Sequence, residues 1–465
     1  MKNLIIKSCF LFAAVALISC SRDEGNLQPA SFPTTAEVFT DVPVGLTDQF
    51  FISFDPAAGA NTDGFGVDEN EAYEGTTSIR IEVPSADDPN GNFIGGIFKD
   101  RNSGRNLTGY NTLSFWAKGS TTATVGTFGF GDDFEGGRYA ATISEVRLST
   151  SWKKYYVPIP DPSKLTQEKG MFLFSAGTQS TNGAGYTIWI DEIRFEDTGL
   201  VAQPLPQIFN GEDQETSTFN EVTIPVAGAS VVFNVDGTEV PVSAAPSYFD
   251  FEASNPDVAS VDESGTITVN SAGTSIISAS IGSTKARGSL EVNSAGAFNG
   301  APTPPNRNAS DVVSIFSDAY DNVQVDNYNG FFQFSTTQGG AISIGNENII
   351  SYTQLNFVSI NMFNSPDVDA SEMTHIHVDI NVRESIDPSD FIRFQLINNN
   401  GPSETSGSVQ LGDYAALQED TWVSYDIPLT DFSGIGNTND IDLIFFVSDG
   451  TISSIYVDNV YFYKQ

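Results

Sequence analysis

The sequence predicts an all-β protein built from several β-sandwich domains, and three observations lead to that prediction. Apolar residues recur in short runs that alternate with polar ones, as in strands with one buried face. Glycine (41) and phenylalanine (35) are abundant while methionine is rare (4), which is typical of all-β modules. One pair of motifs also occurs twice. With 465 residues the chain is too long for one ordinary domain, and we expect about three.

The repeated motifs define two copies of one fold. Residues 152–159 (WKKYYVPI) match residues 422–429 (WVSYDIPL), and residues 188–195 (IWIDEIRF) match residues 455–462 (IYVDNVYF). The interval from the proline to the aspartate is 33 residues in the first copy and 30 in the second. Two motifs in the same order at similar spacing are hard to obtain by chance, so we infer two related modules. They span residues 37–197 and 302–465.

Alternation within the repeated strands separates a core face from an outer face. In the first copy we expect Tyr155, Val157 and Ile159 to face the core. An antiparallel sandwich buries one face of each sheet and leaves the other in water. The first module therefore directs three of the chain's four tryptophans away from its core. The residues expected on outer faces there are Trp116, Lys118, Trp152, Lys154, Tyr156, Trp189 and Asp191.

A different segment, residues 204–293, lies between the two copies. It contains FEASNPDVASV at 251–261, then GTITV at 265–269 and an AGT corner at 272–274. This series of a strand, a turn and two further strands resembles the group 2 bacterial immunoglobulin-like domain. The resemblance implies a third β-sandwich that serves as a spacer. Prolines on both sides of it stiffen the junctions.

The first residues predict an export signal. In residues 1–19, Lys2 and Lys7 accompany an apolar stretch that is too short to span a bilayer. It ends in LISC, which resembles the lipobox of bacterial lipoproteins and implies lipidation of Cys20. A plain secretory signal with an incidental cysteine is the alternative. Residues 20–36 then form a lipidated tether, whose acidic beginning resembles the export signal of surface lipoproteins in Bacteroidota.

The charge balance limits the classes of partner. The chain has 59 acidic and 21 basic residues, a formal net charge of −38. Nucleic-acid binding needs clustered Lys and Arg to neutralise phosphates, and electrostatic docking on an anionic membrane needs them too. The composition disfavours both. The hydrophobic fraction of 40% is enough for packed cores and argues against disorder of the whole chain.

The two outer modules resemble carbohydrate-binding jelly-roll modules. The first carries residues 73–75 (YEG), 107–110 (LTGY) and 115–119 (FWAKG) before its repeated motifs. This order is typical of galactose-binding-like sandwiches attached to polysaccharide-degrading systems. The second is similar to the C-terminal module of some secreted β-glucanases and of glycan-binding lipoproteins of marine Bacteroidota. The residues that carry the second resemblance are 309–320, 373–379 and 455–462.

The resemblance implies a non-catalytic, multimodular surface glycan-binding lipoprotein of a Bacteroidota polysaccharide utilisation system. It implies a lipid anchor in the outer membrane at the cell surface, beside a SusD-like protein and a TonB-dependent transporter. Its laminarin-type ligand, a β-1,3-glucan, is implied by similarity to modules of β-1,3-glucanases. In the family of the second module a tryptophan commonly lies near the Asn-Tyr-Asn-Gly stretch, where this chain has Phe331 and Phe332.

Aromatic and polar side chains are the groups that recognise sugars. Flat aromatic rings cover the C–H face of a pyranose, while carboxylates, amides and cations bind its hydroxyl rim. The alternatives are that the outward tryptophans pack against loops, that residues 130–139 form only a polar turn, and that Phe331 and Phe332 lie in the core. The predicted glycan-binding residues are Trp116, Phe134, Arg138, Tyr139, Trp152, Tyr156, Trp189, Tyr320, Tyr328, Phe331, Phe332, His377 and Trp422.

Two sets of residues are candidates for a metal. Sandwich modules of the resembling type often hold a structural calcium between the first and last strands, and calcium prefers carboxylate oxygens. We therefore expect Asp55 and Asp191 to be the calcium ligands in the first module, and Asp318 and Asp458 to be those in the second. The only two histidines, His375 and His377, share a strand face with an aspartate. One expectation is that the two histidines bind a metal together with this aspartate. The alternative is that they only form hydrogen bonds on a half-exposed strand.

Nothing in the sequence points to catalysis. Glycoside hydrolysis needs two carboxylates at a defined separation, but with 59 acids some pair always looks suitable. The chain has no G-x-S-x-G elbow, no H-E-x-x-H helix and no P-loop. We therefore predict no enzyme and no catalytic cofactor. A glycanase or lyase with an unrecognised active site in an outer module, and a purely structural adhesin, are the alternatives.

Overall fold

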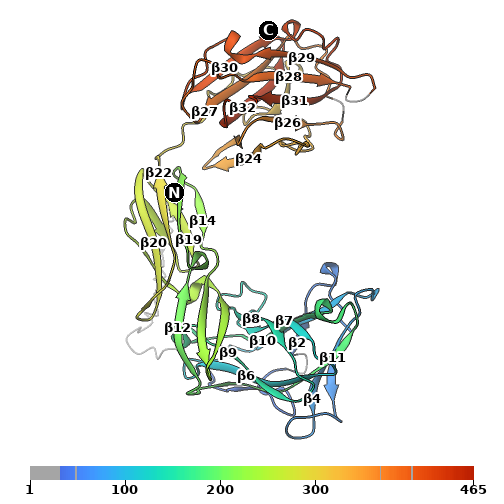
Figure 1. Cartoon of the computed structure of the whole chain (residues 1–465), viewed down its shortest axis with the longest axis vertical. Coiled ribbons are helices and arrows are strands. Elements are labelled where there is room, and N and C mark those ends of the chain that lie inside the picture. Colours follow the sequence, from blue (N-terminus) through green and yellow to red (C-terminus); the bar gives the residue numbers. More distant parts are fainter. Residues whose placement is uncertain (1–31, 48–49, 367, 400–401) are drawn as a thin grey trace, which may run out of the picture. The chain divides into compact units, whose positions relative to one another are not determined.

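The computed structural model describes residues 32–47, 50–366, 368–399 and 402–465 (Figure 1). The predicted signal peptide, Cys20 and the tether up to residue 31 lie outside the described residues. Nearly all of the regular secondary structure in the described residues is β-strand, which confirms the predicted fold class. None of its helices is long and apolar enough to cross a membrane. Its helical turns are three-residue 3-10 helices: η2 (Pro56–Ala58), η3 (Pro162–Lys164), η4 (Gln179–Thr181), η5 (Phe209–Gly211), η6 (Pro246–Tyr248), η7 (Ala309–Asp311), η8 (Leu411–Asp413) and η9 (Leu429–Asp431).

The first module is a sandwich of two antiparallel sheets, sheet A and sheet B. Sheet A has the order β3-β4-β11-β6-β9, and β1 pairs with β11 as well. The expected core residues of its strands are buried, because alternate side chains point between the sheets. The strands of sheet A are β1 (Glu37–Phe39), β3 (Phe65–Asp68), β4 (Ser78–Val83), β6 (Thr112–Gly119), β9 (Lys153–Pro158) and β11 (Tyr186–Glu196).

Sheet B has the order β8-β7-β10-β5-β2 within the first module. Phenylalanines from both sheets fill the core, and the rings of Phe98, Phe115 and Phe128 all lie within 6.0 Å of Phe172. Burial of large aromatic surfaces of this kind stabilises the sandwich. The strands of sheet B are β2 (Phe51–Ser53), β5 (Phe93–Lys99), β7 (Thr124–Phe130), β8 (Ala141–Arg147) and β10 (Gly170–Gly177).

The second module repeats this topology with its own two sheets, C and D. Sheet C has the order β24-β25-β32-β27-β30, with β23 also paired to β32, and sheet D has the order β26-β31-β28-β29. The strands of sheet C are β23 (Val312–Phe316), β24 (Gln338–Ile344), β25 (Glu347–Thr353), β27 (His375–Val382), β30 (Trp422–Pro428) and β32 (Ser454–Tyr463). Those of sheet D are β26 (Phe357–Asn361), β28 (Arg393–Asn398), β29 (Thr405–Gln410) and β31 (Ile441–Val447).

The repeated D-[EN] motif marks the same bulge in the two last strands, β11 and β32. Glu192 and Asn459 have positive φ angles of 51° each, which interrupts the regular ladder. The preceding carboxylates stabilise the bulge, because Asp191 and Asp458 accept the next residue's N–H at 2.8 and 2.6 Å. A structural requirement of the strand therefore accounts for this motif.

The middle segment contributes two further sheets. One has the order β13-β22-β20-β17 with β21 on β20, and the other has the order β14-β19-β18. Residues 233–242 of this segment belong to the compact unit of the first module, where β16 continues sheet B beyond β8. The strands are β12 (Val201–Gln207), β13 (Asp213–Thr218), β14 (Thr223–Pro225), β15 (Ser230–Val235), β16 (Thr238–Ala244), β17 (Asp250–Ala253), β18 (Ala259–Val261), β19 (Thr266–Val269), β20 (Gly273–Ile281), β21 (Thr284–Lys285) and β22 (Ser289–Ser294).

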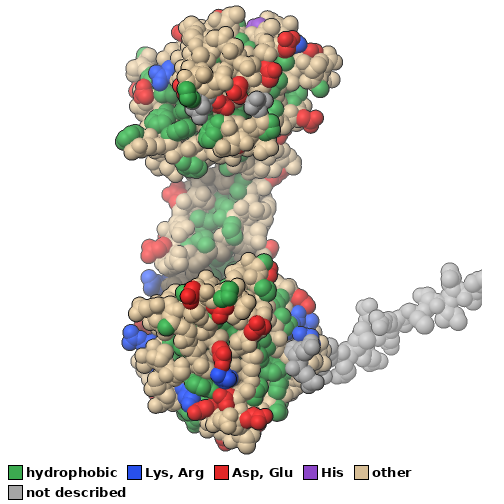
Figure 2. All heavy atoms as spheres, turned by 90° about the vertical axis from the view of Figure 1, so that its right-hand side faces the viewer, with side chains coloured by type: hydrophobic (Ala, Val, Ile, Leu, Met, Phe, Trp, Pro, Cys, Tyr) green, Lys and Arg blue, Asp and Glu red, His purple; other side chains and the backbone are tan. Residues whose placement is uncertain are grey.

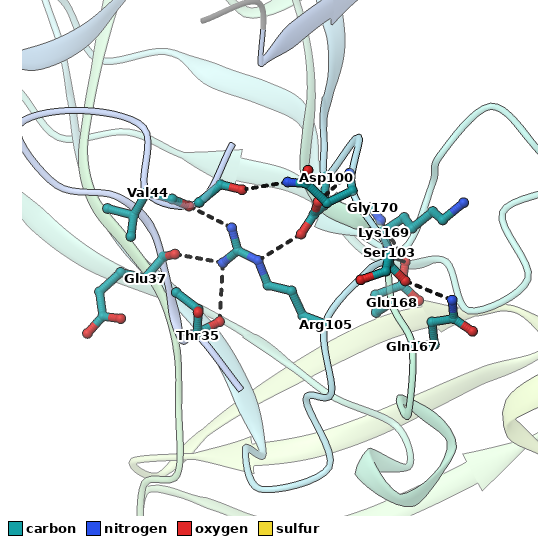
Figure 3. Close-up of polar contacts among 12 residues, drawn as sticks. Thr35, Glu37, Val44, Asp100, Ser103, Arg105, Gln167, Glu168, Lys169 and Gly170 are labelled. Carbon is teal, nitrogen blue, oxygen red and sulfur yellow. Dashed lines mark hydrogen bonds and ion pairs between the residues drawn. The ribbon is translucent and has the colours of Figure 1, made fainter. Parts of the chain in front are cut away.

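A buried arginine ties the first strand of the first module to the loop after β5 (Figure 3). Arg105 is only 1% exposed, and its Nε donates to Asp100 Oδ2 at 3.2 Å. Its Nη1 donates to the backbone oxygens of Thr35 and Glu37 at 3.2 and 2.7 Å, and its Nη2 to that of Val44 at 2.6 Å. One guanidinium thus satisfies a buried carboxylate and three carbonyls at once.

Candidate functional site

The outer face of sheet A carries the tryptophans that alternation predicts, but a loop covers them. The ring of Tyr73 stacks on Trp116 at 3.7 Å and 12°, and it meets Trp152 edge-on at 6.1 Å. Asp191 fixes this loop by accepting the backbone N–H groups of Tyr73 and Glu74 at 2.9 and 3.2 Å. For Trp116, therefore, the structure shows the alternative of packing against a loop.

The remaining groups of this face are also paired with one another. Lys118 Nζ lies 4.8 Å from the ring centre of Trp189 and 5.4 Å from that of Trp152, and it forms an ion pair with Glu71. The indole N–H of Trp189 donates to Asp68 Oδ2 at 2.8 Å. We call Tyr73, Trp116, Lys118, Trp152 and Trp189 the indole cluster. Its rings and charges contact each other. Tyr73 is 40% exposed, and the other four residues are half-buried.

Tyr156 lies on the same face, beyond the indole cluster. Lys154 Nζ is 5.4 Å from its ring centre and also pairs with Glu196 at 2.7 Å. The ring of Tyr156 is half-buried. The glycan-binding roles of Trp116, Trp152, Tyr156 and Trp189 stay predictions.

The outer face of sheet B is open and forms a groove of about 740 Å³. Its floor consists of small residues because Ser175 of β10 lies opposite Gly95 of β5 and Thr127 of β7. Amides, hydroxyls and a carboxylate surround this floor, and Phe93 at the start of β5 also lines the groove. The groove is lined by Ala86, Asn92, Phe93, Thr124, Gly126, Glu145, Ser175, Gly177, Thr178, Gln179, Ser180 and Gly183.

An aromatic pair lies on the same side of sheet B, beginning over Gly95. A Cβ on Gly95 would come within 2.8 Å of the Phe54 ring, so Phe54 lies directly over the floor position next to Ser175. The Phe54 and Phe134 rings are 5.8 Å apart at 58°, and Phe134 is 48% exposed. Of the aromatic residues predicted to bind glycan in the first module, Phe134 is the one with an exposed ring.

The loop that carries Phe134 holds it in a rare conformation. Phe134 has a φ of 59°, which is costly for a bulky residue and persists only where the surroundings enforce it. Its N–H donates to Asp132 Oδ1 at 2.9 Å, and Lys99 donates to Asp133 O and Glu135 Oε1 at 2.8 and 2.7 Å. The loop is thus a braced turn that presents an aromatic ring, rather than a polar turn alone.

A second hollow of about 340 Å³ lies on the other side of this loop. The guanidinium of Arg138 is 5.3 Å from the ring centre of Tyr139, and both residues line the hollow. The glycan-binding roles predicted for Arg138 and Tyr139 stay predictions. The lining residues are Gly131, Asp133, Glu135, Arg138, Tyr139, Lys164, Thr166, Gln167, Glu168 and Lys169.

Glu168 is the buried carboxyl of this hollow, and it is 6% exposed. It accepts the backbone N–H groups of Lys169 and Gly170 at 2.9 and 2.7 Å. Burial raises the pKa of Glu168 to about 7, although the hydrogen bonds from Gly170 and Lys169 favour the charged form. Glu168 could not be recognised from the sequence, because its burial depends on contacts with residues far along the chain, such as Arg105 and the loop after β7.

The raised pKa of Glu168 predicts that the first module is more stable in acid. The folded-state pKa of about 7 exceeds the ordinary value of 4.5, so this stabilisation is complete below pH 4.5 and is lost as the pH rises through 7. Glu168→Gln should remove about 3 kcal/mol of the stability difference between pH 4.5 and 8. Urea unfolding, monitored by tryptophan fluorescence at the two pH values, measures this free-energy difference. Glu82→Gln, at an exposed position, is the control. An unchanged pH profile in Glu168→Gln would refute the assignment.

In the second module, the linker before it covers the outer face of sheet C. The indole N–H of Trp422 donates to Asn299 O at 2.7 Å, and the hydroxyl of Tyr320 donates to Pro305 O. The guanidinium of Arg307 stacks over Tyr463 at 4.0 Å. Trp422 and Tyr320 thus hold the linker in the structure, and their glycan-binding roles stay predictions.

The two histidines lie on the same face, and His377 forms ion pairs there. His377 Nδ1 lies 2.8 Å from Asp426, and its Nε2 lies 3.3 Å from Asp379. Burial alone would lower the pKa of His377, but the hydrogen bonds to Asp379 and Asp426 outweigh it and raise the pKa to about 9. Both ring nitrogens of His377 are thus engaged by carboxylates, which favours the hydrogen-bonding alternative for this residue. His375 stacks on Tyr463 instead.

The other residues of the second module that we predicted to bind glycan are of two kinds, packed and exposed. Tyr328 is half-buried, contacts Phe316 edge-on at 5.2 Å, and accepts the Tyr352 hydroxyl with its backbone oxygen. Phe331 and Phe332 are exposed rather than part of the core. The alternative that this pair lies in the core is therefore wrong.

The four aspartates of the calcium prediction lie in different settings. Asp55 caps η2 by accepting the N–H of Ala57 at 2.9 Å, and Asp318 accepts both the backbone and side-chain N–H of Asn348. Burial raises the pKa of Asp191 to about 6 and that of Asp458 to about 7. Within the described residues, no three His, Cys, Asp or Glu side chains are arranged to hold a metal ion. Structural calcium stays a prediction.

Comparison with known proteins supports carbohydrate binding. Residues 37–197 match the family model of carbohydrate binding domain 30, and residues 245–283 match that of the intimin immunoglobulin-like domain. No curated protein matches the chain. The matches support a multimodular carbohydrate-binding protein, and carbohydrate-binding modules are themselves non-catalytic.

Solved structures with similarity to the chain are also carbohydrate-binding modules. A family 30 module of a cellulosomal cellulase of Clostridium thermocellum is 17% identical, with coverage of 36% of this chain and 96% of that module, at a TM-score of 0.24. A family 11 module of the same organism, in complex with a β-1,3-1,4-mixed-linked tetrasaccharide, is 20% identical, with coverage of 33% and 96% and a TM-score of 0.23. The tandem family 22 modules of Paenibacillus barcinonensis Xyn10C are 11% identical, with coverage of 94% and 100% and a TM-score of 0.22.

Proposed function

We propose that this protein is a non-catalytic surface lipoprotein that captures a polysaccharide for a TonB-dependent uptake system. The observation that carries the proposal is the open groove of sheet B, which lies in the region that matches a carbohydrate-binding family. Its floor of small residues leaves room for a sugar chain. Asn92, Glu145 and Gln179 line it with groups that bind hydroxyls, and Phe93 adds an aromatic residue to the lining.

The ligand we propose is a laminarin-type β-1,3-glucan. The resemblance of the second module to those of β-1,3-glucanases supports this choice, and the charge of the chain is consistent with it. Loss of Lys2 and Lys7 with the signal peptide would change the net charge from −38 to −40. Figure 2 shows Asp and Glu side chains spread over the viewed surface. Such a chain repels sulfated and uronate polymers, so a neutral glucan is easier to hold.

A glycan panel tests this function. Electrophoresis of the full chain in gels that contain laminarin, mixed-linkage β-1,3-1,4-glucan, alginate or mannan reports binding as retardation. Incubation with the same polymers for a day, followed by measurement of reducing ends, reports cleavage. We expect retardation by laminarin and no new reducing ends. Binding to alginate or mannan without binding to laminarin would refute the ligand, and new reducing ends would support the alternative of an enzyme.

The anchor is a separate part of the proposal. We infer lipidation at Cys20, which would place the protein at the cell surface beside a SusD-like protein and its transporter. Several acyl chains hold a protein stably on a membrane, whereas one chain binds only marginally. Cys20→Ala should therefore move the protein from the outer-membrane fraction to the soluble fraction in cells. Full retention of the variant in the membrane would show that the lipobox assignment is wrong.

A further inference from the structure

We propose that the outer face of sheet D, in the second module, is a second binding surface for a neutral glucan chain. The proposal rests on the function proposed above and adds a site to it. The site consists of Phe332, Arg393, Gln395 and Phe445, which we call the sheet D site. None of these except Phe332 could be recognised from the sequence alone.

The ladder of sheet D brings three of these residues together on one face. Phe445 of β31 lies directly opposite Gln395 of β28, and Arg393 precedes Gln395 by two positions on β28. Directly opposite residues have Cβ atoms about 5 Å apart, and residues two positions apart share a face. Phe394 and Phe446 are fully buried between the sheets, so the alternate residues Gln395 and Phe445 face outward.

A braced loop adds the fourth residue. The Phe332 ring packs against Phe445 with a centre-to-centre distance of 5.5 Å. Asn329 donates to the backbone oxygens of Thr337 and Gly339, both at 3.2 Å, and Ser335 Oγ donates to Phe357 O at 2.7 Å. The loop is therefore fastened to sheet D, and Phe332 from the loop forms an apolar wall with Phe445 of β31, beside Gln395.

The same loop exposes two more phenylalanines, and both have backbone conformations that are unfavourable in free energy. Phe331 and Phe334 have φ angles of 47° and 74°, and they are 75% and 81% exposed. Strained, exposed apolar residues of this kind mark surfaces that bind something. Phe134 of the first module shares the arrangement, because Phe134 and Phe331 each donate an N–H to the side chain two residues earlier. Each module thus holds an exposed phenylalanine on an Asx turn.

Arg393 supplies the strongest indication of a ligand. The other cations of the second module have partners: Arg307 contacts Lys464 O and Tyr463, Arg383 pairs with Asp420, and Lys464 pairs with Glu372. The backbone of Arg393 pairs within sheet D, but in the described part of the chain its guanidinium has no hydrogen-bond or ion-pair partner. Its Nε is buried without a partner. An unsatisfied donor has a free-energy cost that ligand hydroxyls would remove.

The chemistry of the four residues fits a neutral pyranose polymer. Phenylalanine rings cover the C–H face of a sugar, while the guanidinium and the amide bind its hydroxyls. Ser408 and Gln410, opposite Gln395 and Arg393 on β29, extend the polar part of the face. An isolated arginine also suits the carboxylate of a uronate. The negative charge of the chain favours the neutral polymer.

Titration calorimetry of the full chain with laminarihexaose tests this site. We expect two molecules to bind to the wild-type protein and one to bind to Arg393→Met or Phe332→Ala, with the second site weakened at least about tenfold. Because the Arg393 guanidinium has no partner in the described part of the chain, Arg393→Met should keep the wild-type melting temperature. His375→Ala, on the outer face of sheet C, is the matched control and should keep both sites.

Hydrogen exchange on the wild-type protein locates the ligand. Saturating laminarihexaose should slow exchange in residues 330–335 and in β28. Two sites that survive Arg393→Met, or one site on the wild-type protein, would overturn the sheet D site while leaving capture by the first module intact. Binding of an alginate oligomer that depends on Arg393 would overturn the assignment to a neutral glucan. No glucan binding at all would refute both proposals.

Discussion

Replacement of Arg105 by methionine is expected to destabilise the first module by about 3–5 kcal/mol. The variant leaves Asp100, whose side chain is 5% exposed, as an uncompensated buried charge. It also removes the donors to the carbonyls of Thr35, Glu37 and Val44, which anchor the chain around β1 (Figure 3). Guanidinium chloride unfolding monitored by tryptophan fluorescence measures the loss, because three of the four tryptophans lie in this module.

Two controls make the Arg105 result specific. Arg80→Met removes an ion pair with Glu82 in which both side chains are about half exposed, and it should cost less than about 1 kcal/mol. The double variant Arg105→Met/Asp100→Asn should lose less stability than the sum of its two single variants, because no charge remains buried. A loss below about 1 kcal/mol for Arg105→Met alone would show that this network contributes little to stability.

Ser175→Trp is expected to weaken laminarin binding by the first module at least about a hundredfold, a cost of about 3 kcal/mol. Ser175 lies on the floor of the groove, opposite Gly95 and Thr127, so an indole there would occupy the space that we assign to the sugar chain. Ser175→Ala keeps the floor open and should change the affinity only slightly. Affinity electrophoresis and calorimetry measure both, and circular dichroism confirms that each variant folds.

The outcome for Ser175→Trp also separates the two faces of the first module. If laminarin binding survives in the folded variant, the groove is not the site. The indole cluster on sheet A then becomes the better candidate, and Trp116→Ala and Trp189→Ala should each weaken binding. If the indole cluster is structural, those two variants should instead lower the melting temperature and leave the affinity of the folded protein unchanged.

Alternation along the sequence was sufficient to predict the sheets and their faces. Tyr155 and Val157 are buried while Trp152 and Tyr156 are half-buried on the other side, as a period of two requires. The repeated motifs likewise lie on equivalent strands of the two modules, β9 with β30 and β11 with β32. These features depend only on residues close together in the sequence, which is why they could be read from it.

The binding sites could not be predicted in the same way. The segments that cover the outer face of a sheet are distant in the sequence from the strands that they cover. Trp116 faces outward as predicted, yet Tyr73, more than forty residues earlier, stacks on it. Trp422 faces outward too, and Asn299 reaches it from the linker. The groove had one local signal that was overlooked: Ser175 and Gly177, at alternate positions of β10, are both small.

The order of strands in sheet A has a consequence for how the module assembles. The strand that is made last, β11, lies in the middle of the sheet between β4 and β6, and β1 also pairs with it. Until residues 186–196 have emerged from a ribosome or an export channel, β3-β4 and β6-β9 are two separate ribbons. The pairing of β1 with β11 also joins the two ends of the module, and such distant contacts make folding slow. The module therefore closes in one late step that depends on its final eleven-residue strand, and a nascent chain stays open along its middle until that strand arrives.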